Sequence, residues 1–256
     1  MDDRQMADML LAARAGAAIV TPPVLAGEAQ AYAVQRLVMA GLGPIGGWKV
    51  GAGGPDAPPS CAPMPASLVV PAPHAFDAAV FTRREVESEI CFRLAGDLAA
   101  RDIPYARAEM LAAIGTCHPG IEVLQSRYAD PDAAGEWANL ADLIQHGAYA
   151  WGAPIEAFRS IDFAAMTVEQ TVAGGPALHA TGNPAGDMVR LLLWLANTGA
   201  VWAGGLRAGQ IVTCGSWTGK TACPAGATVT TAFKGSQPVA IVFGVADPGQ
   251  QIPGRW

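Results

Sequence analysis

The chain has few basic residues. Its 256 residues include only 16 lysines and arginines against 22 aspartates and glutamates, which gives a formal net charge of −6. A chain with this balance has no broad positive surface to neutralise a phosphate backbone or an anionic lipid surface. We therefore expect neither a nucleic-acid partner nor electrostatic binding to a membrane.

Long apolar runs are also missing. The longest uncharged apolar stretch, near Leu191 to Ala196, is far shorter than the roughly 20 residues that a membrane-spanning helix requires. At the start of the chain, Asp2 and Asp3 stand where a secretory signal carries basic residues, and residues 6–13 are better described as part of an amphipathic helix. These absences predict a protein that is neither inserted in a membrane nor exported.

The cysteines lack the spacing of a zinc site or a disulfide framework. There are five, an odd number, and no two form a CxxC pair or a zinc-ribbon arrangement. We expect reduced thiols and a cytoplasmic location. The five residues are Cys61, Cys91, Cys117, Cys214 and Cys223.

What is present is enough apolar sequence, 51% of residues, for one main core. Ala, Leu and Met recur at helical spacing in residues 3–19 and 28–40, which predicts an amino-terminal helical layer. Residues 53–73 hold seven prolines, so we expect a long ordered loop without regular structure there. The other expected elements are strands at 48–50, 86–94, 121–124, 211–213, 228–233 and 239–245, and helices at 106–115 and 184–197, the last capped by Asn183.

The strand at 86–94 alternates in character and has one polar face. Glu87 and Glu89 lie two residues apart on that face, with alpha carbons roughly 6.5 to 7 Å apart. Both carboxylates can reach one cation, and a third oxygen ligand would complete a site for a hard ion such as Mg²⁺ or Mn²⁺. The alternative from spacing alone is a solvated strand face that binds nothing.

A second pattern is a series of short segments that are hard to obtain by chance in this order: Gly47–Gly51, Val86–Ile90, Pro119–Val123, Ser126–Arg127, Gly182–Pro184, Trp194–Asn197 and Leu206–Val212. In these segments the chain resembles the 2-keto-4-pentenoate hydratase and 4-oxalocrotonate decarboxylase family of the fumarylacetoacetate hydrolase superfamily. The resemblance spans about two-thirds of the chain.

The resemblance implies an α+β fold, mainly a mixed β roll, in which residues 1–45 form the helical layer and residues 46–256 the catalytic β-roll domain of one structural unit. It also implies a homo-oligomer that acts on a small 2-oxo or 2-hydroxy acid. The family's metal ligands correspond to Glu87, Glu89 and Glu122, and its pocket lysine corresponds to the catalytic candidate Lys49. For Lys49 the alternative is an edge-strand lysine that discourages strand pairing.

Three further residues are candidates for weaker reasons. Arg127 can bind a substrate carboxylate or instead neutralise Glu122, and Ser216 can donate a hydrogen bond to the substrate. Where relatives tend to have Asp-Asn, this chain has Gln145-His146-Gly147, so His146 is a candidate acid/base group, with a surface histidine as the alternative. Family members often carry an acidic residue in the loop after the lysine strand, whereas the corresponding stretch here, Cys61–Pro65, has none.

The function that the resemblance implies is metal-dependent hydration of a short 2-hydroxy-dienoate or 2-oxo-3-enoate. The alternatives are a 4-oxalocrotonate-type decarboxylase, a C–C bond hydrolase of the same superfamily, and a catalytically silent relative. A nucleotide-binding P-loop at residues 215–221 is excluded, because three residues instead of four separate its glycines and a strand pattern follows instead of a helix.

Overall fold

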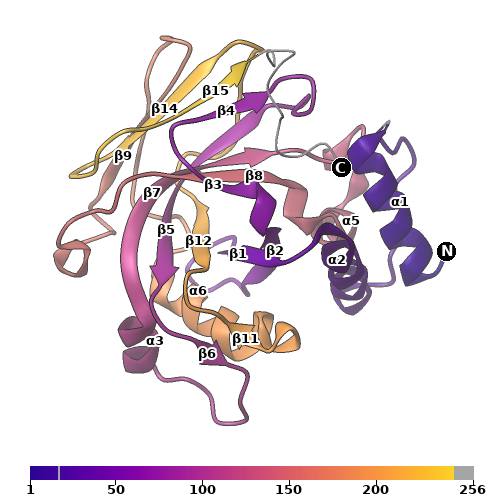
Figure 1. Cartoon of the computed structure of the whole chain (residues 1–256), viewed down its shortest axis with the longest axis horizontal. Helices are drawn as coiled ribbons and strands as arrows, with labels where there is room; N and C mark the ends of the chain where they lie inside the picture. Colours follow the sequence, from indigo (N-terminus) through magenta and orange to yellow (C-terminus); the bar gives the residue numbers. More distant parts are fainter. Residues whose placement is uncertain (17, 245–256) are drawn as a thin grey trace.

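The computed structural model describes residues 1–16 and 18–244, and it confirms the expected α+β fold. Figure 1 shows a large curved sheet through the middle of the molecule, helices α1, α2 and α5 on one side, and α3 and α6 at one end. The helices are α1 (Asp3–Ala15), α2 (Glu28–Leu42), α3 (Arg107–Ala113), α4 (Pro131–Ala134), α5 (Glu136–Ala141) and α6 (Met188–Trp194).

The described strands form one large sheet and two smaller ones. The large sheet has the order β2 (Ser60–Pro65), β1 (Ile45–Gly51), β12 (Ile211–Ser216), β5 (Glu85–Leu94), β7 (Ile114–Leu124), β8 (His146–Trp151) and β3 (Val69–Pro71), with β13 (Thr221–Ala222) also on β5. The second has the order β10 (Leu178–Thr181), β9 (Thr167–Val172), β14 (Thr228–Phe233), β15 (Val239–Gly244) and β4 (His74–Asp77). A short pair joins β11 (Gly205–Leu206) to β6 (Leu98–Ala99).

The first helix begins where the sequence places a good cap. The Asp2 side chain accepts a hydrogen bond from the Gln5 backbone, and the Gln5 side chain accepts one from the Asp2 backbone, which satisfies two free N–H groups of the first turn. The helix ends at Ala15, so the prediction of helix to residue 19 was too long; Ile19 instead forms an isolated bridge with Tyr128. Residue 17 lies outside the described residues.

The two amino-terminal helices pack through buried apolar residues such as Leu10 and Val38. The same core cluster includes Leu140 of α5 and Leu143, which follow β7 in the chain. The core thus joins residues of the predicted layer, 1–45, to residues of the predicted roll, 46–256.

The expectation of a proline-rich segment without regular structure holds for residues 53–59 and was wrong for residues 60–71. Residues 60–65 form β2, which pairs antiparallel with β1, and residues 69–71 form β3. Both strands lie at the two ends of the large sheet. Edge strands tolerate proline because one row of their backbone N–H groups has no ladder partner to lose. A high proline count therefore does not exclude a strand at the edge of a sheet.

Strand β5 belongs to the large sheet and contacts the second sheet through a side chain. It also has the polar face predicted from its alternation. Ser88, on the face opposite to Glu87 and Glu89, hydrogen-bonds to Gln170 of β9 at 2.6 Å and to Thr231 of β14 at 2.7 Å. This buried network fixes which face of β5 meets the second sheet. The glutamates must consequently face the other way.

Several predicted boundaries need correction. The helix expected at 106–115 ends at Ala113. Strand β7 follows directly and covers Ile114–Leu124, so it begins seven residues before the predicted strand at 121–124. Helix α6 begins at Met188 and not at Pro184, since the Asp187 side chain caps it by accepting from the Val189 backbone.

The carboxyl-terminal third is β-rich as expected. The predicted strands at 211–213 and 228–233 appear in β12 and β14, and that at 239–245 appears as β15, with residue 245 outside the described residues. In the part of the chain that the structure describes, no helix combines the length and the apolar character needed to cross a bilayer.

Candidate active site

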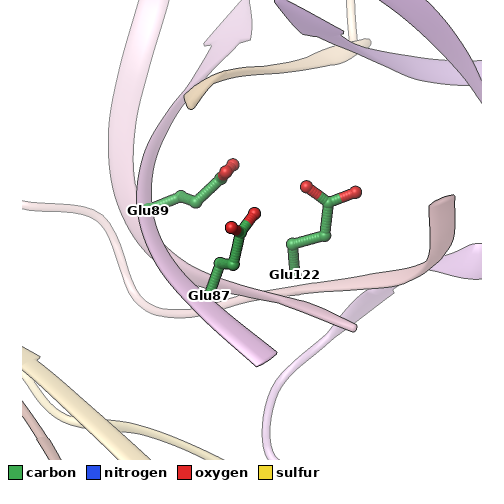
Figure 2. A group of neighbouring side chains, drawn as sticks. All are labelled: Glu87, Glu89 and Glu122. Carbon is green, nitrogen blue, oxygen red and sulfur yellow. The ribbon is translucent and has the colours of Figure 1, made fainter. Parts of the chain in front are cut away.

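Three carboxylates meet on one side of the large sheet. Glu87 and Glu122 are direct partners in the antiparallel register of β5 and β7, and Glu89 lies one step further along β5. One oxygen from each side chain lies within 4.8 Å of the others. Figure 2 shows the three side chains pointing toward a common space. The solvated-face alternative fails, because Glu89 and Glu122 are buried and Glu87 is partly buried.

Glu122 has an uneven set of partners. Its Oε1 accepts hydrogen bonds from Lys49 Nζ at 2.6 Å and from His146 Nδ1 at 3.1 Å. Its Oε2 is buried and has no hydrogen-bond partner among the described residues. A buried carboxylate oxygen without a donor is costly. This oxygen is therefore the one available to a cation.

Lys49 does not occupy an edge strand, so the alternative of an edge-strand lysine was wrong. It lies on β1, which pairs with β2 on one side and β12 on the other. Burial on its own would lower the pKa of Lys49, but the negative charges of Glu122, Glu87 and Glu89 outweigh it and raise that pKa. In this arrangement Lys49 is an ammonium that donates a hydrogen bond to Glu122.

The second partner of Lys49 is a backbone carbonyl in an unusual turn. Lys49 Nζ donates to the Ile144 oxygen at 3.1 Å. Leu143, Ile144 and Gln145 all have positive φ, at 53°, 52° and 59°. Residues other than glycine rarely adopt this left-handed conformation, and it is most unfavourable for a β-branched residue such as Ile144. Sequence reasoning gave no sign of this turn.

The electrostatics of the carboxylates differ. Burial first, and then the charge of Glu122, raises the pKa of Glu87 to about 7. Burial and its two acidic neighbours hold the pKa of Glu89 well above its usual range, even though Thr213 donates a hydrogen bond to it. Burial would also raise the pKa of Glu122, but Lys49 and the His146 hydrogen bond bring it below its ordinary value. Of the three carboxylates, Glu122 is therefore the one whose pKa favours the ionised form.

The carboxylates open into a cavity of about 270 Å³. Its walls come from β1, β2, β5, β7, β12, the turn after α5 and the segment before α6. Ser216, a predicted substrate-binding residue, lies in this wall, and so do Asn183 and Ser60, which sequence reasoning did not assign to the site. The lining residues are Lys49, Val50, Gly51, Ala52, Ser60, Glu87, Glu89, Glu122, Ile144, Asn183, Pro184, Ala185, Gly215 and Ser216.

This donor set fits a divalent cation. All three candidate ligands are carboxylate oxygens, which suit a hard ion such as Mg²⁺ or Mn²⁺. Three carboxylates stand against the single ammonium of Lys49, and the raised pKa values of Glu87 and Glu89 register that excess of negative charge. Glu122 Oε2 in addition has no donor within residues 1–16 and 18–244. A cation would remove both costs.

Arg127 lies elsewhere. Its Nε donates to the Asp142 carboxylate at 2.6 Å, and its Nη2 donates to the His146 carbonyl at 3.1 Å. Arg127 does not line the cavity, and its carboxylate partner is Asp142 and not Glu122. The contacts therefore support neither predicted role of this arginine, substrate binding or neutralisation of Glu122.

His146 is completely buried, so the alternative of a surface histidine was wrong. Burial first, and then the Glu122 contact acting in the opposite sense, leaves its pKa at about 4. A neutral ring can donate from Nδ1 to Glu122. The ring does not line the cavity. Its position is that of a residue that orients Glu122, and not of an acid/base group in contact with a substrate.

The P-loop alternative fails structurally as well. Residues 221–222 form strand β13, and the next element is strand β14, so no helix follows the glycine-rich stretch. Lys220 donates to the Gln145 side chain at 3.3 Å.

No protein-family model and no curated protein sequence matches this chain. Solved structures do match, and they define the class of fold. A protein from Yersinia pestis CO92 described as a fumarylacetoacetate hydrolase family protein superposes with a TM-score of 0.57 at 16% identity, over 78% of this chain and 92% of that one. The chain thus has the fold of the fumarylacetoacetate hydrolase superfamily, as the sequence resemblance implied.

Another neighbour matches over almost the whole length of both chains. The 4-oxalocrotonate decarboxylase from Pseudomonas putida G7, in complex with magnesium and adipate, superposes with a TM-score of 0.79 at 20% identity, over 94% of this chain and 96% of that one. The 2-hydroxyhepta-2,4-diene-1,7-dioate isomerase from Mycobacterium marinum gives a TM-score of 0.53 at 18% identity, over 81% and 77%. These likenesses establish the shared fold.

Proposed function

We propose that the chain is a divalent-metal-dependent hydratase that adds water to a short 2-hydroxy-dienoate or 2-oxo-3-enoate. The observation that carries the proposal is the group of three carboxylates facing a cavity that also contains a buried ammonium. The decarboxylase with the same fold is complexed with magnesium, which supports a metal-dependent reaction.

Glu87, Glu89 and Glu122 would hold Mg²⁺ or Mn²⁺, which when bound supplies Lewis-acid stabilisation of negative charge on the substrate's C2 oxygen. Lys49 adds a fixed positive charge at the same cavity, held by Glu122 and by the Ile144 carbonyl. The neutral His146 ring keeps the Glu122 carboxylate in one orientation. Ser216 lines the same cavity, and its hydroxyl can donate to the bound acid while it accepts from the Gly219 backbone. The Asn183 side chain is instead engaged with the Cys214 carbonyl and the Ala185 backbone.

The charge of the lining favours a monocarboxylate. Lys49 is the one cationic side chain among the lining residues, and it already pairs with Glu122. The carboxylate at the far end of a dicarboxylate would therefore lack a cationic partner in this cavity. Leaving it unpaired would cost several kcal/mol, enough to weaken binding by orders of magnitude.

The alternative is a 4-oxalocrotonate-type decarboxylase, which the TM-score of 0.79 to such an enzyme favours. A substrate panel separates the two. With Mg²⁺ or Mn²⁺, we expect the protein to consume 2-hydroxypenta-2,4-dienoate, followed as loss of ultraviolet absorbance, faster than it releases carbon dioxide from 2-oxo-3-hexenedioate.

Carbon dioxide release without dienoate consumption would reverse this assignment. Inactivity on both acids, with metal bound, would favour a catalytically silent relative or a different substrate. The Glu89→Gln variant is the control for both assays, because its loss of a metal ligand should remove activity that depends on the site.

A further inference from the structure

A second small pocket lies between helix α1 and the roll. It measures about 40 Å³ and shares no lining residue with the cavity of the carboxylates. Two arginines, Arg14 from the end of α1 and Arg127 after β7, line it together with apolar residues such as Leu68 and Phe81. Two like charges in one small apolar pocket call for a counterion.

The two arginines differ in their partners. Arg127 has partners on two of its three side-chain nitrogens: Asp142 accepts from its Nε at 2.6 Å, and the Asp142 and His146 carbonyls accept from its Nη2 at 3.4 Å and 3.1 Å. The Nε and Nη2 atoms of Arg14 are buried and have no hydrogen-bond partner among the described residues. These two nitrogens carry most of the N–H donors of a guanidinium.

The charge of the pocket is also unbalanced. Asp142 is the carboxylate of this group, and it pairs directly with Arg127. Burial first, and repulsion by Arg127 second, lowers the pKa of Arg14 to about 9, so the group remains mostly protonated at neutral pH. A water molecule could accept hydrogen bonds from Arg14, but it would leave the positive charge without compensation.

We propose that Arg14 and Arg127 bind a small monovalent anion, which accepts hydrogen bonds from Arg14 Nε and Nη2. One water needs roughly 10–15 Å³ of such space, so 40 Å³ accommodates an ion of one to three heavy atoms, such as chloride or formate. The anion joins the end of α1 to the segment that follows β7. This site is independent of the proposed hydratase activity.

The direct test is crystallographic, on the full chain. Crystals soaked in sodium bromide should show an anomalous bromide peak at hydrogen-bonding distance from Arg14 Nε and Nη2. A peak in this pocket supports the proposal without any variant. Empty or water-like density there at a bromide concentration that occupies other surface positions would overturn it.

A solution test distinguishes the chemistry of the anion. Sodium gluconate, whose anion is too large for the pocket, is replaced by sodium chloride or by sodium formate at constant ionic strength, and the Tm is measured. We expect at least one of the small anions to raise the Tm by roughly 2–6 °C. The larger of the two responses distinguishes a halide from a carboxylate as the occupant, and no response to either contradicts the proposal.

The matched variants are Arg14→Met and Arg4→Met. Both remove an arginine from α1, but the Arg4 side chain is exposed and pairs with Asp8. Arg14→Met should lose the Tm response to the small anion, and Arg4→Met should keep it. An undiminished response in Arg14→Met would remove the site from this pocket. If Arg14→Met does not fold, the bromide experiment on the unaltered chain still decides.

Discussion

Two buried groups of charged side chains meet at His146, and they differ in the sign of the charge left over. The His146 ring contacts Glu122, where three carboxylates stand against one ammonium. The His146 carbonyl contacts Arg127, where two guanidiniums stand against the carboxylate of Asp142. In each group, the uncompensated sign indicates the ligand: a cation for the first and an anion for the second.

The largest effect is expected when one negative charge is removed from the group of three carboxylates. Glu87→Gln and Glu89→Gln should each weaken Mn²⁺ binding by a factor of about 10³ or more, because each loses a charged ligand. Calorimetric titration of the wild type should show one ion per chain. The matched control is Glu85→Gln on the same strand, whose side chain pairs with Arg83, and it should bind Mn²⁺ normally. Undiminished binding in both site variants would contradict the assignment.

The corresponding change in the basic group is Asp142→Asn. It leaves Arg127 buried without its carboxylate, which should destabilise the fold by about 3–5 kcal/mol and lower the Tm by roughly 6–20 °C. Thermal unfolding measures this, and calorimetry at a temperature below the transition should still show one Mn²⁺ per chain. Loss of the metal with the Tm unchanged would show that the two groups are not separate.

Replacing Lys49 tests whether its positive charge, next to the three carboxylates, contributes to catalysis. Lys49→Met should lower turnover by about 10²-fold, a typical loss when one group that stabilises developing charge is removed. Steady-state assays on the dienoate measure the effect, with circular dichroism as the check on folding. Lys234→Met, which removes an exposed lysine in the turn after β14, is the control and should change turnover little. Wild-type rates in Lys49→Met would mean that this lysine only balances Glu122.

A smaller effect is expected from pH. The pKa of Glu87 is raised to about 7, above its value in an unfolded chain, so its contribution to the stability of the metal-free protein is present at acid pH and is lost as pH rises through 7. A cation competes with that proton, and its affinity should rise by up to about tenfold per pH unit below 7. The Mn²⁺-induced increase in Tm should therefore be larger at pH 8 than at pH 6. An increase that is equal at the two pH values would contradict a protonated Glu87.

Local pattern predicted part of the site, and contacts distant in sequence supplied the rest. Alternation along 86–94 was enough to put Glu87 and Glu89 on one face. Glu122 stands alone in an apolar strand, so only the family resemblance pointed to it, although it is the direct strand partner of Glu87. The fold class followed from the same resemblance and from the β-rich carboxyl-terminal third.

The errors have a common physical origin. Arg127 was expected to pair with a substrate or with Glu122, because the sequence gives no sign that the turn after α5 brings Asp142 beside it. The proline-rich segment was expected to be irregular, because the sequence does not reveal that β2 lies at a sheet edge. Both depend on which segments become neighbours in space, which neither propensity nor spacing encodes.

The left-handed turn at residues 143–145 would have a consequence for the rate of the proposed reaction. Glycine would fit the positive φ values, but it would also leave the turn free to adopt many other conformations. With leucine, isoleucine and glutamine in these positions, few other arrangements keep the surrounding contacts, so the Ile144 carbonyl is preorganised to hold Lys49 before any substrate arrives. The conformational cost is then met once, when the chain folds, and is not repeated at each turnover.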